Sequence, residues 1–93
     1  MSVLRLAEHA VFDDTDGAGV VLDNRKGVYL SLNGVATVML RAALRFDTTD
    51  QVVDHLKRHI DADADTLRQG LDELVEQLIE HGLLAPVRQG RPG

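Results

Sequence analysis

The hydrophobic pattern of the chain changes its period at Asn33, and this change fixes the order of the secondary structure. In the stretch VYLSL that precedes it, Val28, Leu30 and Leu32 alternate with two other residues, as in a strand whose apolar face packs on a core. After Asn33 the apolar residues follow helical spacing, and asparagine itself is a preferred N-cap. The sequence therefore predicts a strand that runs directly into a helix over about 34–45.

Two apolar runs before this strand are also predicted to be β-structure. Residues 3–12 contain alternating apolar pairs, which indicate one strand or two short ones, and residues 20–22 are rich in β-formers. The segments 13–19 and 23–27 contain aspartate and glycine, residues that favour turns. Residues 20–32 are therefore expected to form a hairpin.

Two more helices are predicted after the first. Thr48 or Thr49 suits the N-cap of the second helix. The third begins near Asp65 or Thr66 and ends at His81-Gly82, where glycine supplies a left-handed C-cap. The expected inner face of the third helix consists of Leu67, Leu71, Leu74 and Leu78, widened by Val75 and Ile79.

Length and composition limit what the chain can be. With 93 residues, no cysteine and a formal charge of -5, it is expected to be one domain without disulfides or thiolate metal sites. The negative charge disfavours binding to the phosphates of nucleic acids. No apolar run is long enough to span a membrane and no signal peptide is evident, so we expect a cytoplasmic protein. The domain is expected at 1–87, followed by a flexible tail at 88–93.

No catalytic or metal-binding motif accounts for the polar residues. His55 and His59 have the i, i+4 spacing of a zinc pair, but the cations Lys57 and Arg58 lie between them. The acidic stretch 61–65 has alternating aspartates and lacks the glycine of a calcium loop. We therefore expect no metal, no cofactor and no enzymatic activity in this chain.

The strand before Asn33 offers a different kind of site. If this strand lies at the edge of a small sheet, its unpaired N–H and C=O groups form a template for another extended chain. The third helix would then form the second wall of a groove, an arrangement used in β-strand addition. The alternative is that the apolar side chains of strand and helix serve the core alone.

Three short stretches carry a family resemblance: Tyr29-x-x-Leu32-Asn33-Gly34 followed by Ala36, the apolar Val38-Met39-Leu40, and the closing Gly82-Leu83-Leu84. In this order they resemble the PqqD-like family of peptide-binding winged-helix domains, also called recognition elements of ribosomally made and modified peptides (RiPPs). The resemblance implies an α+β fold that is winged helix-turn-helix-like, with a three-stranded antiparallel sheet followed by three helices.

The resemblance also implies a function. Domains of this family bind the leader segment of a precursor peptide as an added strand and deliver the precursor to modifying enzymes. A free-standing copy is similar to the leader-binding protein of lasso-peptide pathways, whose partners are a separate leader peptidase and an ATP-dependent macrocyclising synthetase. We expect a monomer or weak dimer that binds neither nucleic acid nor membrane.

Carried over by position, the implied binding residues fall on one strand and one helix. Gly70 costs its helix about 1 kcal/mol relative to alanine, so either a close approach requires it or it is a neutral accident. The acidic side chains near it suit Lys or Arg of a leader, or else form a solvated face. The expected peptide-binding residues are Val28, Tyr29, Leu30, Ser31 and Leu32 on the strand, and Leu67, Gly70, Leu71, Asp72, Glu73, Leu74, Val75, Glu76 and Leu78 on the helix.

Two other functions remain open. A winged-helix DNA-binding transcription regulator has a similar plan, but the third helix offers Arg68 as its cation against five acidic residues. A dimerisation module would instead pair the same strand edge with a second copy of the chain.

Overall fold

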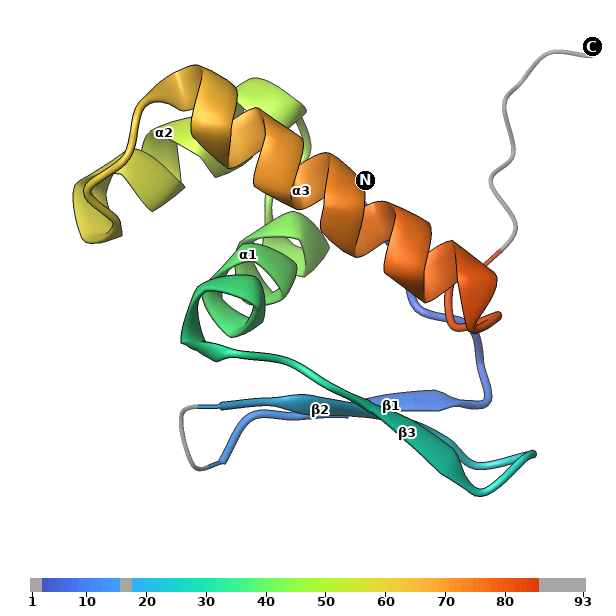
Figure 1. Cartoon of the computed structure of the whole chain (residues 1–93). Helices are drawn as coiled ribbons and strands as arrows, with labels where there is room; N and C mark the ends of the chain where they lie inside the picture. The colour runs from blue at the N-terminus through green and yellow to red at the C-terminus, as the bar shows by residue number, and fades with distance from the viewer. Residues whose placement is uncertain (1–2, 16–17, 86–93) are drawn as a thin grey trace, which may run out of the picture.

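A computed structural model describes residues 3–15 and 18–85 and has a three-stranded antiparallel sheet followed by three helices (Figure 1). The three helices lie on one side of the sheet. The α+β prediction is therefore confirmed, whereas the predicted tail at 88–93 lies outside the described residues. The elements are β1 (Ala10–Asp13), β2 (Val20–Asp23), β3 (Val28–Ser31), α1 (Gly34–Arg45), α2 (Thr49–His59) and α3 (Ala64–Glu80).

The sheet has the order β1-β2-β3, so β1 and β3 are its two edges. Its pairing places one row of apolar side chains toward the helices and another on the opposite face, as the period of two requires. The inner row is Phe12, Val21 and Leu30, and the outer row is Val11, Leu22 and Tyr29.

Each helix begins at a side-chain cap. Asn33 Oδ1 accepts a hydrogen bond from the Ala36 N–H at 2.8 Å, and Thr48 forms a capping box with Gln51. Asp63 caps α3 by accepting from the Thr66 N–H at 2.8 Å. The predicted start of α3 near Asp65 or Thr66 was therefore slightly late, because an earlier aspartate supplies the cap.

The core is almost wholly aliphatic, and one buried hydroxyl joins its two layers. Thr37 of α1 is fully buried; its Oγ1 accepts from the Gly19 N–H at 2.7 Å and donates to the Asn33 carbonyl at 2.8 Å. The Gly19 N–H and the Thr37 hydroxyl thereby both have hydrogen-bond partners, at the point where the chain entering β2 meets α1. The inner face of α3 consists of Leu67, Leu71, Leu74 and Leu78, each at most 4% exposed, as predicted.

Three details of the sequence prediction were wrong. Within residues 3–12, regular pairing begins at Ala10, while Leu6 makes an isolated bridge to Leu84. Val28 is 49% exposed rather than inward, because the tip of the β2–β3 hairpin extends beyond the helices (Figure 1). Ile79 is 61% exposed, so it does not widen the buried stripe of α3.

No helix of the described residues is long and apolar enough to cross a membrane.

Candidate functional site

The open edge of β3 has a definite hydrogen-bonding register. The Leu32 N–H donates to the Gly19 carbonyl at 2.8 Å. In an antiparallel ladder, hydrogen-bonded pairs alternate with pairs that are not hydrogen-bonded, so every second residue of β3 counted from Leu32 bonds to β2. Leu30 is therefore bonded to β2. By the same alternation, the N–H and C=O groups of Tyr29 and Ser31 point away from β2, toward the free edge.

The turn before β3 is held by a buried aspartate. Asp23 is 1% exposed, and its Oδ1 accepts from the N–H groups of Arg25 at 2.9 Å and Lys26 at 3.1 Å. Burial raises the pKa of Asp23. The two hydrogen bonds and the nearby positive charges together lower the pKa by more than burial raises it, so it lies below its usual 3.8. The carboxylate thus fixes the hairpin that presents the edge of β3.

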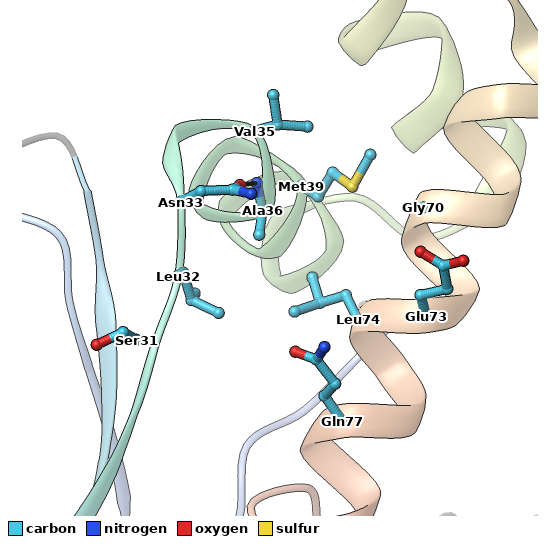
Figure 2. A pocket seen from close by; sticks show the side chains of 10 residues that line it. All are labelled: Ser31, Leu32, Asn33, Val35, Ala36, Met39, Gly70, Glu73, Leu74 and Gln77. Carbon is cyan, nitrogen blue, oxygen red and sulfur yellow. Dashed lines mark hydrogen bonds between the residues drawn. The ribbon is translucent and has the colours of Figure 1, made fainter.

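A pocket of about 350 Å³ lies beside the end of β3 (Figure 2). It opens between that strand, the first turn of α1 and the middle of α3. The pocket therefore adjoins the open backbone edge at Ser31. Its lining consists of Ser31, Leu32, Asn33, Val35, Ala36, Met39, Gly70, Glu73, Leu74 and Gln77.

Apolar side chains form part of the pocket lining and meet at a glycine. Leu32 and Leu74 point toward one another from opposite sides, and Met39 extends toward Gly70 (Figure 2). A Cβ atom at Gly70 would lie 2.8 Å from Met39 Cε, closer than real contacts allow. Of the two explanations for Gly70, the close approach of a side chain is therefore the one that the structure supports.

The rim of the pocket is polar and carries one charge. Glu73 is the charged residue among the lining residues, and Gln77 and Asn33 add amide groups. The cation of α3, Arg68, is engaged elsewhere, because its Nη2 lies 2.6 Å from Asp50 Oδ1. The exposed side of this pocket is therefore electronegative.

The expected binding residues fall into three groups. Ser31, Leu32, Gly70, Glu73 and Leu74 come together in the pocket lining. Leu67, Leu71 and Leu78 are core side chains, exposed at 1%, 3% and 0%, and they are not among the residues that line the pocket. The others, along β3 and on the remaining faces of α3, lie outside the pocket lining: Val28, Tyr29, Leu30, Asp72, Val75 and Glu76.

Sequence reasoning missed half of the lining. Gln77 follows Gly70 and Glu73 at helical spacing on α3, so the periodicity contained a signal for it. The α1 side of the pocket had no comparable signal, because its residues belong to a stripe that reads as core. The missed residues are Asn33, Val35, Ala36, Met39 and Gln77.

The histidine pair on α2 lies apart from this pocket. The ring centroids of His55 and His59 are 4.6 Å apart, and the ring centroid of Phe46 lies 5.1 Å from that of His55. Burial and the neighbouring His59 lower the pKa of His55 below 6.5. Within the described ranges, no three His, Cys, Asp or Glu side chains are grouped so that they would hold a metal ion.

Comparisons with known proteins agree with this architecture. Two solved structures are similar over their whole length: "Lasso peptide synthetase B1 complexed with the leader peptide" (26% identity, 91% of this chain, TM-score 0.79) and "TbiB1 in Complex with the TbiA(beta) Leader Peptide" (19% identity, 92% of this chain, TM-score 0.78). No curated protein matches the sequence. The family model of PqqD, coenzyme PQQ synthesis protein D, matches residues 18–84, and the chain therefore belongs to the PqqD family.

Proposed function

We propose that this chain binds the leader segment of a ribosomally made precursor peptide in lasso-peptide biosynthesis. The leader adds as a fourth strand along β3 and places an anchoring side chain in the adjacent pocket. The observation that carries the proposal is the open backbone edge at Tyr29 and Ser31 next to a pocket that Ser31 itself lines. Both similar solved structures hold a leader peptide, which supports it further.

Affinity in this proposal comes from a few groups. The backbone of Tyr29 and Ser31 supplies hydrogen bonds that do not depend on the leader sequence, whereas the pocket supplies selectivity. A small number of buried anchors carries most of the binding energy in such interfaces. Leu67, Leu71 and Leu78 of α3 act indirectly, since their packing holds the helix that carries Glu73 and Leu74.

The proposal assigns the chemistry to partner proteins. The chain delivers the bound precursor to a separate leader peptidase and to an ATP-dependent macrocyclising synthetase, and it has no catalytic role itself. It acts in the cytoplasm, where a ribosomal precursor is made, as a monomer or weak dimer. The binding domain spans residues 1–87.

Fluorescence anisotropy tests this function. A labelled leader segment, taken from the precursor gene beside the gene for this chain, is titrated with the protein. We expect saturable binding, and its absence at tens of micromolar protein counts against the proposal. Ser31→Pro removes an outward N–H that the sheet does not use, so it should weaken binding while the protein stays folded.

The DNA-binding alternative is disfavoured by charge. A recognition helix at α3 would present Asp65, Asp72, Glu73, Glu76 and Glu80 to phosphate, while Arg68 is paired with Asp50. A gel-shift assay at low salt is expected to show no sequence-dependent binding. Light scattering over a range of concentrations distinguishes a peptide receptor from a module that dimerises through β3.

A further inference from the structure

The pocket beside β3 combines surfaces that suit one class of side chain. Val35, which is 46% exposed, and the outer atoms of Leu32, Met39 and Leu74 give it apolar surface. Glu73 of α3 also lines it and is drawn over the α3 ribbon near Gly70 (Figure 2). An anchor that fits this pocket must cover the apolar surface and also meet a charged acceptor. The following inference rests on the proposed function, because it concerns which peptide side chain enters this pocket.

Among the residues that the structure describes, no cation is paired with Glu73. Among the described residues, the Lys and Arg side chains that form ion pairs are Arg41 with Asp14 and Arg68 with Asp50. Arg68, the cation of α3, is engaged by Asp50 instead, and Glu73 is the one charged residue in the pocket lining as far as residues 3–15 and 18–85 are concerned. Glu73 is exposed, so its carboxylate is open to solvent as long as the pocket is empty.

Occupation of the pocket changes this balance. A wholly apolar anchor would displace water from the rim and leave the Glu73 carboxylate less well solvated, which is unfavourable unless a donor replaces the water. A Lys or Arg side chain avoids this loss, because its aliphatic stem covers apolar surface while its charged end remains at the rim. The charge-assisted hydrogen bond is also stronger than a neutral one.

We propose that the pocket selects a basic residue of the bound peptide, with Glu73 as the specificity-determining acceptor. The stem of the Lys or Arg lies against Leu32, Met39 and Leu74, and its cation lies at the Glu73 carboxylate. Side chains of an added strand point toward α3 at every second position. The basic anchor is thus the residue of the peptide that faces α3 beside the end of β3.

Two variants of α3, each with one glutamate replaced by glutamine, distinguish a direct contact at the pocket from the overall negative charge of the helix. Glu73→Gln removes the carboxylate at the pocket, whereas Glu76→Gln makes the same change outside the lining. Both positions are exposed, so both variants should fold, as circular dichroism can verify. A displayed library of random extended peptides, selected on the wild-type protein, supplies the probe, and the best binder is then synthesised.

Changing Glu73 and the basic residue of the peptide, singly and together, tests whether the two interact. Selected peptides should share Arg or Lys at one position, and replacing that Arg by the neutral isostere citrulline, or Lys by norleucine, should weaken wild-type binding by roughly tenfold. Glu73→Gln should weaken binding of the basic peptide by a similar factor. The affinity of this variant should not change when the basic residue of the peptide is replaced by its neutral counterpart. Glu76→Gln should change binding by less than about twofold at physiological salt.

The outcomes distinguish this inference from the function on which it rests. If the selected peptides lose affinity on Ser31→Pro but show no basic preference, or if the two glutamine variants respond alike, the role of Glu73 is overturned and strand addition stands. If no selected peptide is sensitive to Ser31→Pro, the proposed strand addition fails and the inference fails with it.

Discussion

The two walls of the proposed groove, α3 and β3, are built in different ways. The 17 residues of α3 include four leucines that are at most 4% exposed, so its position is fixed by the core. The four residues of β3 include none that is fully buried, and Leu30 is the one that packs partly on the core. The strand is held by its ladder to β2 and by the Asp23 turn.

This difference separates stability from recognition. The helix contributes to stability through its buried leucines, of which Leu74 also lines the pocket, and this packing holds its polar residues Glu73 and Gln77 in place. The strand contributes little buried surface, but its free edge is the part of the backbone suited to pairing with a peptide. Substitutions should therefore affect unfolding most on α3 and peptide binding most on β3 and at the pocket.

The largest expected effect is on the free energy of unfolding. Leu78→Ala removes a side chain that is 0% exposed and should destabilise the protein by about 2–5 kcal/mol. The matched control Val28→Ala, at a position that is 49% exposed, should change stability by less than about 0.5 kcal/mol. Denaturant unfolding measures both, and equal losses would contradict the division between the two walls.

A change at Gly70 should affect the pocket more than the fold. Alanine is favoured over glycine in a helix by about 1 kcal/mol, but its Cβ would lie 2.8 Å from Met39 Cε and displace that flexible end. We expect Gly70→Ala to remain folded and to bind the leader roughly tenfold more weakly, because Met39 moves within the pocket. Unchanged affinity, measured by anisotropy, would remove Gly70 and Met39 from the binding site.

The hairpin that presents β3 should weaken in acid. Because the pKa of Asp23 is lower when folded, its carboxylate stabilises the fold above pH 3.8 and loses this effect as the pH falls through the folded pKa. Asp23→Asn keeps an acceptor for the Arg25 and Lys26 amides but does not titrate. Thermal unfolding should therefore show a melting temperature that falls further for the wild type than for Asp23→Asn below pH 3.8; parallel curves would contradict this role.

The smallest expected effect lies on α2, away from both walls. His55→Ala and His59→Ala should leave leader affinity within about twofold of the wild type, since neither side chain lines the pocket or the free edge. A large loss of binding, with the helical signal unchanged, would show that the interface extends to α2.

The sequence predicted most of the fold because local signals agreed with one another. Asn33, Thr48 and Gly82 lie at the helix ends where their types suggested, and the leucine repeat of α3 is buried. The first strand was less predictable, because the apolar residues Leu4 and Leu6 serve packing and an isolated bridge rather than a regular ladder. The spacing of apolar residues in the sequence indicates which side chains are buried. It does not indicate which other part of the chain covers each of them.

The site was predictable only in part for the same physical reason. The strand residues and the acidic helix face were identified, but Met39 and Val35 read as ordinary members of an apolar helical stripe. Whether such residues enter a core or line a pocket depends on the angle between α1 and α3. That angle is set by contacts distant in the sequence, which a local pattern does not contain.

Hydrogen exchange of individual amides tests strand addition most directly. With and without a saturating leader peptide, the exchange rates of Tyr29 and Ser31 are compared with that of Phe12, whose N–H points to the open edge of β1 by the same alternation. We expect exchange at Tyr29 and Ser31 to slow by at least roughly tenfold on binding, while exchange at Phe12 stays unchanged. Unchanged exchange at Tyr29 and Ser31 in a saturated complex would contradict strand addition.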